Sequence, residues 1–416
     1  MDYEAAFKKI KAELLASAGG ESHWTGELSA SALSTATAVS AFSLAGGPLD
    51  KELIDKGLKW LESNQNYEGG WGDTIKSPCN LPTTMLVTAA FELSGKTAGY
   101  EACLGKAEEY LIRKAGKSSS ERRTKLYEIY GKDRTFVVPI LVNLALAGKV
   151  EWKEIPFLPF ELAALPAAFY RMINLPVVSY ALPALISMGQ IIFDKRNSKN
   201  ILRKITAKIT LRKLQAIQPE SGGYLEAIPL TAFVVMSLMP LYGLGQPVVV
   251  NGLKFLRKAA SADGSWPIDS NLSQWLTTQS VQALSVRGGE TLNGTKAWLL
   301  KNQTQNRHKY TDSAPGAWGW SDLSGSVPDA DDTASALLAL MELGAKDCRE
   351  AVDSGAEWLR NLQNSDGGFP TFCKGRLELP FDKSSPDITA HCLRALNAIK
   401  GKCSFWSGIN RQDGDA

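Results

Sequence analysis

Apolar residues recur at helical spacing in many short segments of the chain, and polar, glycine-containing stretches separate these segments. This spacing predicts α-helices, because residues three or four positions apart lie on one face of a helix. No run of alternating β-branched residues predicts a strand. Five of the apolar segments begin with a threonine and follow a glycine-rich turn: 83–93, 231–238, 277–284, 333–343 and 389–396.

The turns also share a composition, which is a polar stretch with one or two glycines and an aromatic residue. They occupy residues 65–71, 218–224, 263–266, 316–320 and 363–369. The last four recur every roughly 40 to 55 residues, which is typical of stacked supersecondary repeats. Because helical segments also precede the turns, each repeat is predicted to be an outer helix, a turn and an inner helix. Such pairs stack into a curved or closed all-α layer, in which rings such as Trp71 and Trp266 plug neighbouring pairs.

One helix start carries an unusual concentration of carboxylates. Pro328 and Asp329 resemble a helix entry, and Asp331 and Asp332 follow within its first turn. A single Asp there indicates only a cap, because helix N-termini present unpaired N–H groups and a partial positive charge. Three carboxylates so close together are not expected to ionise fully, so the group should retain a proton and is a candidate acid.

The region between the first and second repeats has a different pattern. Residues 155–193 are apolar and rich in proline, and residues 172–193 carry no charge. This length suffices for a bilayer span of roughly 20 residues, but the prolines favour broken helices that are buried in protein or dip into one leaflet. A basic and apolar run follows at 195–213, and it suits either an anionic membrane surface or a solvated helix packed on the protein body.

Composition narrows the function classes. The chain has 416 residues, of which 44% are apolar, and a net charge of +3, which describes a globular protein of most simply two domains and gives no support for nucleic-acid binding. Residues 1–15 lack the apolar centre of a secretion signal, so a cytoplasmic protein is expected. The six cysteines contain no Cys-x-x-Cys pair, which argues against a zinc ribbon or a disulfide framework. The sequence has no redox-cofactor motif or phosphate-binding loop, and we expect neither a cofactor nor a metal.

Three features together resemble the squalene-hopene cyclases, a family of class II terpene cyclases. They are the string Asp-Ala-Asp-Asp-Thr-Ala at 329–334, the repeated glycine-aromatic turns, and the segment 381–391 that ends in His391. The resemblance covers residues 24–391 and implies two α/α barrels, one inserted into the sequence of the other, with an apolar cavity between them. It also implies monotopic attachment to the cytoplasmic face of a membrane that supplies a squalene-like polyprene.

The resemblance further implies the catalytic residues. The proton donor is Asp331, flanked by Asp329 and Asp332, and its partner is His391, with Asp387 four residues earlier. The chemistry independently favours this set, because protonating an isolated alkene requires an acid that keeps its proton near neutral pH. Repulsion within the cluster holds that proton, and a donor such as His391 stabilises the conjugate base. Asp387 and His391, at i and i+4, are expected to share a helix face, so that Asp387 orients or charges the imidazole.

Carbocation intermediates require a dry cavity whose walls attract positive charge, and aromatic faces provide this attraction. By resemblance, the candidates for substrate contact are Trp275, Trp320, Phe372 and Tyr180, and the turn residue Trp318 is added to them. For each of these side chains, packing in the core is the alternative interpretation.

The expected domains are an N-terminal helix (1–20) packed on the acid-bearing barrel, an inserted barrel (21–249) with a membrane-facing segment (155–213), and the acid-bearing barrel (250–416). A six-pair barrel needs roughly 300 residues at about 50 residues per pair. The acid-bearing barrel is therefore expected to be incomplete and to expose apolar edges, which favours a second chain or a homodimer as partner.

Three functions remain open. The first is a cyclase of squalene or a related polyprene, complete or one subunit of a split enzyme, and a close variant of it acts on a prenyl diphosphate. The second is a truncated, inactive helical scaffold. The third is another α/α-barrel activity, although a protein prenyltransferase would need an Asp-x-Cys plus His zinc site and a glycosidase two separated carboxylates in a polar cleft.

Overall fold

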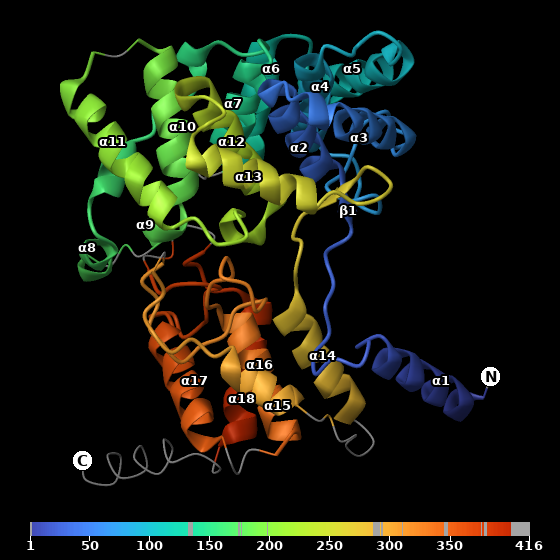
Figure 1. Cartoon of the computed structure of the whole chain (residues 1–416), viewed down its shortest axis with the longest axis vertical. Helices are drawn as coiled ribbons and strands as arrows, with labels where there is room; N and C mark the ends of the chain where they lie inside the picture. Colours follow the sequence, from blue (N-terminus) through green and yellow to red (C-terminus); the bar gives the residue numbers. More distant parts are fainter. Residues whose placement is uncertain are drawn as a thin grey trace. The chain divides into compact units, whose positions relative to one another are not determined.

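The computed structural model describes residues 2–400 except 132–135, 174, 176, 198, 286–291, 293, 310, 345–347, 376 and 378–380. Nearly all regular structure of these residues is helical (Figure 1). The two strands that they contain are short, and β1 (Ala30–Ser31) pairs antiparallel with β2 (Trp266–Pro267). The all-α prediction is therefore confirmed.

The chain forms two compact units, and the second unit interrupts the sequence of the first. The first unit contains residues 1–26, 166–180 and 271–416, and the second contains 27–165 and 181–270. The helices of the first unit are α1 (Tyr3–Ala16), α8 (Ala167–Met172), α9 (Val177–Tyr180), α14 (Ser273–Ser285), α15 (Thr295–Lys301), α16 (Ala330–Glu342), α17 (Arg349–Leu362) and α18 (Pro386–Ile399). The second unit contains the two strands and the helices α2 (Ala32–Ala45), α3 (Lys51–Ser63), α4 (Leu81–Ser94), α5 (Glu101–Ala115), α6 (Ser119–Tyr130), α7 (Val137–Leu146), α10 (Leu182–Lys195), α11 (Ile201–Ala216), α12 (Ile228–Tyr242) and α13 (Pro247–Lys258), with short 3-10 turns at Pro48–Asp50, Trp152–Glu154, Phe160–Ala164 and Tyr224–Glu226.

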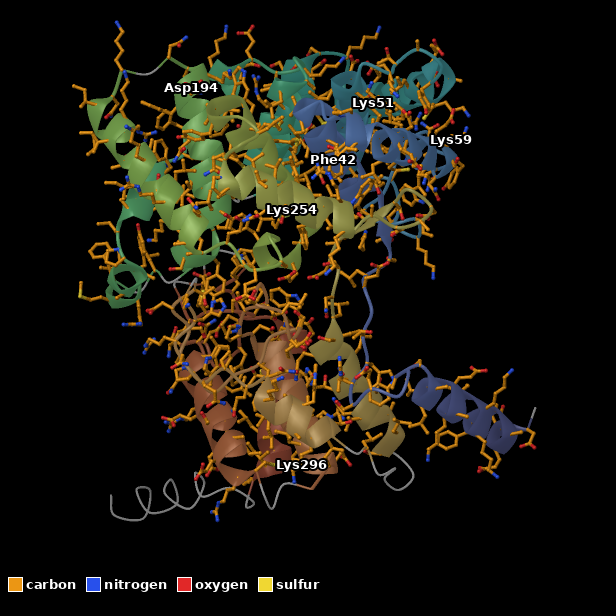
Figure 2. All side chains as sticks on the ribbon, in the orientation of Figure 1. Phe42, Lys51, Lys59, Asp194, Lys254 and Lys296 are labelled. Atoms are coloured by element: carbon orange, nitrogen blue, oxygen red, sulfur yellow. The ribbon has the colours of Figure 1, made fainter. Side chains whose placement is uncertain are left out.

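The inner helices of the second unit close into a ring. Helix α2 packs on α4 and on α12, α4 packs on α7, and α10 packs on both α7 and α12. Inner and outer helices differ in sequence for the reason that the apolar pattern predicts. Helix α2 carries no charge and is buried on all sides, whereas α3 buries only one stripe, and its Lys51 and Lys59 lie on the outside while Phe42 of α2 lies inside (Figure 2).

The aromatic residue of each turn ties the two helices of a pair together. In three turns, the indole N–H or the phenol hydroxyl donates a hydrogen bond to a carbonyl ten residues earlier, in the outer helix: Trp71 to Leu61, Tyr224 to Leu214 and Trp266 to Leu256, at 2.7–2.9 Å. The backbone N–H of the aromatic residue donates to a threonine hydroxyl of an inner helix: Trp24 to Thr277, Trp71 to Thr84, Tyr224 to Thr231, Trp266 to Thr35, Trp318 to Thr333 and Phe369 to Thr389, at 2.9–3.1 Å. The threonines near the helix starts are therefore part of the repeat.

Two of these bonds explain why the unit boundaries differ from the predicted ones. The turn at 263–266 bonds to Thr35 of α2, not to α14, which follows it in the sequence. The turn that ends at Trp24 bonds instead to Thr277 of α14. These two turns are therefore paired with inner helices that do not follow them in the sequence. The boundaries of the units fall at residues 26 and 270 instead of the predicted 20 and 249.

Each turn also contacts the outer helix of the next pair. The side-chain amide of Gln65 donates to Gly69 O in its own turn and to Cys103 O in α5. The same pair of hydrogen bonds recurs at two other glutamines. Gln218 donates to Gly222 O in its turn and to Val248 O in α13, and Gln303 donates to Gly316 O in its turn and to Ala351 O in α17. The turn glycines allow this approach, because an added Cβ would lie 2.6 Å from Lys106 O at Gly69, 2.3 Å from Asn251 O at Gly222 and 3.0 Å from Ser354 O at Gly316.

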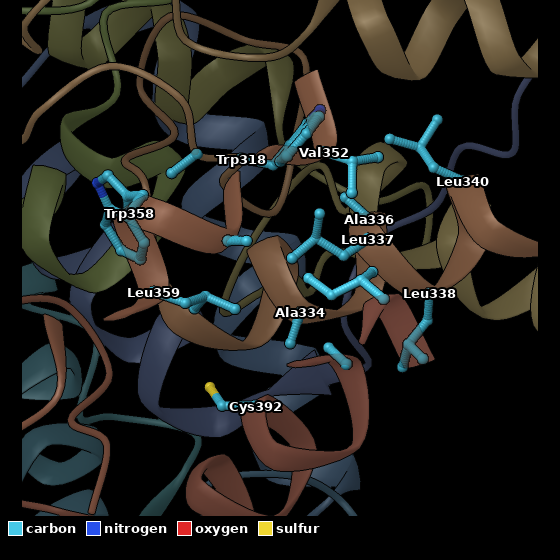
Figure 3. Close-up of a cluster of buried hydrophobic side chains, with 14 of the residues drawn as sticks. Trp318, Ala334, Ala336, Leu337, Leu338, Leu340, Val352, Trp358, Leu359 and Cys392 are labelled. Carbon is cyan, nitrogen blue, oxygen red and sulfur yellow. The ribbon is translucent and has the colours of Figure 1, made fainter. Parts of the chain in front are cut away.

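In the first unit, the inner helices α14, α16 and α18 pack in a row, and α15 and α17 cover them. Their core contains Leu337, Leu359 and Cys392 (Figure 3). The last turn of this unit differs from the others. Within the described residues, the side-chain amide of Gln363 bonds only to Gly367 O, and a Cβ at Gly367 would meet no atom within 4 Å. In this turn, therefore, no described residue covers the surface on which an outer helix packs in the other turns.

Helix α1 precedes the turn at 19–24 as an outer helix would, since Trp24 Nε1 donates to Leu14 O at 2.8 Å. None of its own residues is buried. The expected packing of residues 1–20 on the acid-bearing unit is thus limited to loose contacts of this helix.

The segment at 155–213 contains two helices, α10 and α11, that differ in how far their apolar residues are buried. Helix α10 is an inner helix, and its apolar residues are buried in the second unit, so the prediction that the whole segment faces a membrane is wrong for α10. Among the described residues, no helix is both long and apolar enough to cross a bilayer. Helix α11 differs, because Ile201, Leu202 and Ile205 are 58–73% exposed beside its lysines.

Candidate active site

The acidic string forms the start of inner helix α16. Asp329 is the N-cap, in extended conformation, and its carboxylate accepts a hydrogen bond from the Asp332 N–H at 2.8 Å. The backbone N–H of Ala330 donates to Thr371 O at 2.8 Å, which fixes the helix start to the loop after α17. The cap interpretation therefore applies to Asp329, and Asp331 and Asp332 lie in the first turn.

Asp329 and Asp332 are both buried, with 3% and 4% of their surfaces exposed. Burial raises the pKa of Asp329 well above its ordinary value, and the neighbouring carboxylate of Asp332 raises it further. Burial likewise raises the pKa of Asp332 to about 7, with a contribution from the charge of Asp331. A helix N-terminus by itself would favour the ionised carboxylates, so desolvation outweighs it here and the pair holds a proton at neutral pH.

Asp331 turns towards the neighbouring inner helix α18. Its Oδ1 lies 2.6 Å from Nδ1 of His391, although the two residues are 60 positions apart in the sequence. The side chains of Asp331 and His391 are 33% and 16% exposed. The Asp331 carboxyl is therefore partly shielded, paired with an imidazole, and still open on one side.

The position of Asp387 corrects one sequence-based prediction. Asp387 shares α18 with His391, but its carboxylate is exposed and accepts hydrogen bonds from the Ser385 hydroxyl and the Ile388 N–H, which lower its pKa. No described hydrogen bond or ion pair joins it to His391, whose carboxylate partner is Asp331. The local donors at a helix N-terminus compete successfully for a carboxylate in the first turn, so the spacing of i and i+4 did not produce the expected contact.

Sequence reasoning missed Ser335, which lies one helical turn after Asp331. This side chain is fully buried, and its Oγ is 3.5 Å from Nε2 of His391. The side-chain amide of Gln279, on α14, donates to the same Oγ at 3.4 Å. The spacing of i and i+4 from Asp331 was the available signal, because such residues share a helix face.

Three of the predicted cavity aromatics do lie together. The rings of Tyr180 and Phe372 are 5.3 Å apart, and Trp320 packs edge-on against Phe372 at 6.3 Å. Phe381, which the sequence analysis did not single out, completes the group at 5.5 Å from Phe372. We call these four residues the aromatic cluster. It adjoins the start of α16, because Phe372 follows Thr371, whose carbonyl accepts the hydrogen bond from the Ala330 N–H. Burial raises the pKa of Tyr180, and the charge of Asp329 contributes to this increase.

Trp318 does not belong to this cluster, which corrects its assignment as a substrate-binding residue. It is completely buried, and its Nε1 donates to Leu299 O at 2.7 Å, as the other turn aromatics do in their own pairs. Trp275 lies on α14 and is 38% exposed, and its backbone N–H donates to Trp320 O at 3.2 Å. It is therefore a neighbour of Trp320 by backbone contact.

A cavity of about 540 Å³ opens beside the aromatic cluster within the first unit. Tyr180, Phe372 and Trp358 form part of its wall. Its charged residues are Arg171, Arg307 and Lys374 together with Asp312 and Glu357, and Arg171 is ion-paired with Asp312. In the described ranges, no group of His, Cys, Asp and Glu side chains is arranged to hold a metal ion.

Two family models match this chain: the squalene-hopene cyclase N-terminal domain over residues 7–233 and the squalene-hopene cyclase C-terminal domain over residues 272–404. The chain belongs to the squalene-hopene cyclase family. This confirms the resemblance stated from the acidic string, the turns and the segment that ends in His391. The squalene-hopene cyclase family comprises class II terpene cyclases, which fixes the broad class of this chain.

Individual relatives are distant but cover most of the chain. The probable squalene-hopene cyclase of Sinorhizobium fredii is 23% identical over 93% of this chain and 69% of its own length. The squalene-hopene cyclase of Bradyrhizobium diazoefficiens is 23% identical over 90% of this chain and 66% of its own length. The sporulenol synthase of Bacillus subtilis is 24% identical over 86% of this chain and 65% of its own length. This member of the squalene-hopene cyclase family thus spans about two thirds of their length.

Among solved structures, abietadiene synthase from Abies grandis superimposes with a TM-score of 0.53 at 18% identity, over 98% of this chain and 50% of that one. This likeness shows the fold, and it supports the α/α-barrel assignment of the squalene-hopene cyclase family.

Proposed function

We propose that this protein is a class II terpene cyclase that protonates an alkene of squalene or a related polyprene from Asp331. The observation that carries the proposal is the 2.6 Å contact between Asp331 Oδ1 and His391 Nδ1, beside a buried carboxyl pair and the aromatic cluster. An alkene is a very weak base, so its protonation needs a carboxylic acid whose conjugate base is stabilised at once. The imidazole provides that stabilisation, and the burial of Asp329 and Asp332 opposes full ionisation of the cluster.

After proton transfer, the positive charge lies on carbon and must be kept away from nucleophiles. The faces of Tyr180, Phe372 and Phe381 supply negative electrostatic potential without a strongly basic atom, because a phenol with a raised pKa stays neutral. The π electrons of the next double bond then form a bond to the cationic carbon, and each new bond moves the charge along the polyprene. The reaction ends when the last cation loses a proton or captures water.

The test is Asp331→Asn, which keeps the shape of the side chain and removes the acid. Membranes containing the wild type or the variant are incubated with squalene, and the products are analysed by gas chromatography. We expect cyclised product from the wild type and none from Asp331→Asn, and a matched variant, Asp55→Asn at an exposed position of α3 in the second unit, should retain it. Turnover by Asp331→Asn would remove this residue from the mechanism, and the absence of any product from the wild type would favour an inactive scaffold or one subunit of a split cyclase.

The cavity beside the aromatic cluster favours a second candidate substrate, a prenyl diphosphate. Three of the five charged residues in its wall are cationic, namely Arg171, Arg307 and Lys374. Such side chains are suited to an anionic head group, while Tyr180 and Phe372 would contact the prenyl chain. Binding of radiolabelled geranylgeranyl diphosphate, and its loss in Arg307→Ala, separates this candidate from a hydrocarbon substrate.

For location, we propose that helix α11 holds the protein on the cytoplasmic face of a membrane. Ile201, Leu202 and Ile205 are exposed, and lysines and Arg212 follow on the same helix, which is the composition of a helix that lies on an anionic bilayer. Sedimentation with vesicles that contain an anionic lipid should be reduced by Ile205→Glu. The charge-conserving control Ile205→Leu should sediment like the wild type.

For a partner, we propose that a further outer helix docks on the turn at 363–369. In two other outer helices a glycine lies against the aromatic ring of the turn: a Cβ would lie 3.3 Å from the ring of Trp266 at Gly57 and 2.9 Å from the ring of Trp318 at Gly355, so a docking helix needs a small residue there. Helix α1 has Ile10 at the corresponding position, ahead of Trp24. This difference favours a separate helical repeat over the α1 of a second copy. Light scattering of the purified protein tests it, since a homodimer would contradict this preference.

A further inference from the structure

Side chains from three inner helices of the first unit form a connected set of contacts around His391. His391 of α18 faces Asp331 with Nδ1 and Ser335 with Nε2, and both of these partners lie on α16. Gln279 reaches Ser335 from α14. Because α16 packs on both α14 and α18, these side chains form a continuous connection from the far inner helix to the acid.

The direction of the hydrogen bonds follows from the donors. The amide nitrogen of Gln279 can only donate, so it uses a lone pair of Ser335 Oγ and leaves the hydroxyl hydrogen free. That hydrogen can point to Nε2 of His391, which then acts as an acceptor and leaves the ring hydrogen on Nδ1. The Nδ1–H in turn donates to Asp331 Oδ1 across 2.6 Å.

We propose that Ser335, braced by Gln279, is a positioning residue that keeps His391 in the tautomer with its hydrogen on Nδ1. This inference rests on the proposed function of Asp331. With the hydrogen on Nε2 instead, the bare Nδ1 would accept the proton of Asp331, and the acid would be neutralised by the imidazole before an alkene arrived. With the hydrogen on Nδ1, Asp331 gives its proton to the alkene, the ring neither gains nor loses one, and Nδ1–H stabilises the carboxylate that remains.

The charged groups that face this ring are Asp331 and Asp332, both from α16. In its ionised form each of these carboxylates favours a second hydrogen on the ring, so the neutral tautomer needs a donor at Nε2 to persist. Ser335 is the described side chain that meets this requirement, and its complete burial keeps water from replacing it.

The first test observes the ring directly. Only three histidines occur in the chain, so the full-length protein labelled with ¹⁵N-histidine gives few signals, and His391→Asn identifies those of His391. We expect the wild type to carry its hydrogen on Nδ1 at neutral pH, Ser335→Ala to acquire a hydrogen on Nε2, and Ser335→Thr, which keeps the hydroxyl, to match the wild type. A wild-type ring with its hydrogen on Nε2, or identical ring signals in wild type and Ser335→Ala, would overturn the proposal.

The second test measures turnover. Losing one hydrogen bond of ordinary strength predicts a decrease in kcat of about three- to tenfold in Ser335→Ala, with KM unchanged. Gln279→Leu changes an exposed side chain, so it carries little risk for folding, and it should lower kcat in the same direction by less. Ser237→Ala, at a buried serine of α12 in the second unit, is the matched control and should leave kcat unchanged. A change in KM alone, or no change in kcat, would contradict a positioning role.

The two experiments separate this inference from the proposed function. The ring signals need no substrate, so they decide the role of Ser335 even if the protein cyclises nothing. Conversely, if the enzyme is active and the His391 signals are the same in the wild type and in Ser335→Ala, the positioning role is refuted and Asp331 remains the acid.

Discussion

Replacing Asp332 by asparagine removes a buried carboxyl and nearly preserves its shape, so the pH dependence of stability should change. The folded protein holds the pKa of Asp332 at about 7, against an ordinary value of 3.8, chiefly through burial. A carboxyl with a raised pKa binds its proton more tightly in the folded state than in the unfolded chain. The free energy of unfolding of the wild type therefore falls as the pH rises from about 4 to about 7.

The size of this effect follows from the pKa difference. About three pH units, at about 1.4 kcal/mol each, give at most roughly 4 kcal/mol that the wild type loses between these limits. Asp329 faces the same carboxyl and shares its proton, so the loss belongs to the pair and not to Asp332 alone. In Asp332→Asn this contribution disappears. The free energy of unfolding of the variant, relative to that of the wild type, should therefore increase by a few kcal/mol from pH 5 to pH 8.

The assay is urea unfolding at pH 5 and pH 8, with hydrogen exchange of peptides from α16 to report on the first unit. Asp366→Asn serves as the control, because hydrogen bonds from the Ser384 hydroxyl and the Gly368 N–H lower the pKa of this exposed carboxyl. A lowered pKa contributes stability that is fully present above the ordinary value of 3.8 and is lost only at lower pH, so between pH 5 and pH 8 the control should run parallel to the wild type. Parallel pH curves for the wild type and Asp332→Asn would refute the role of burial.

Three further changes test the repeat architecture. Gly355→Leu should destabilise the first unit by about 1–3 kcal/mol in urea unfolding, because a Cβ there would lie 2.9 Å from the ring of Trp318, whereas Gly105→Leu, where no atom lies within 4 Å, should not destabilise. Trp318→Phe should lower the free energy of unfolding by about 1–3 kcal/mol by leaving Leu299 O without its donor, and gas chromatography should show an unchanged product pattern. Gln303→Leu should lower the melting temperature more than Gln363→Leu, because Gln303 joins two repeats and Gln363 bonds only within its own turn among the described residues.

The helical pairs of this chain were predictable, because both signals that define them are local. Glycine and an aromatic ring mark each turn, and a threonine near the next helix start supplies the hydroxyl that binds the turn. The unit boundaries were not predictable from these signals. The turn at 263–266 bonds to α2 and skips α14, so its partner lies more than two hundred residues earlier, and spacing along the chain carries no trace of that choice.

The members of the candidate acid site could be named from the sequence, but their contacts could not. Three carboxylates and one histidine could be named from the sequence. Which carboxylate meets the imidazole depends on how α18 packs against α16, and this packing directs Asp331 to His391 while Asp329 and Asp332 point into the core. Asp387 had the correct spacing for His391, but the hydroxyl of Ser385 is nearer and binds it.

The two tryptophans of the turn at 316–320 show how repetition separates structure from function. Trp318 occupies the position that Trp71 and Trp266 hold in other turns, and all three bury their rings and donate to an outer helix. Trp320 has no counterpart at that position, and its buried Nε1 has no hydrogen-bond partner among the described residues. The repeat does not require the ring of Trp320, which lies beside Phe372 in the aromatic cluster. In a repeat protein, the aromatic residues that depart from the repeat are therefore the better candidates for contact with substrate.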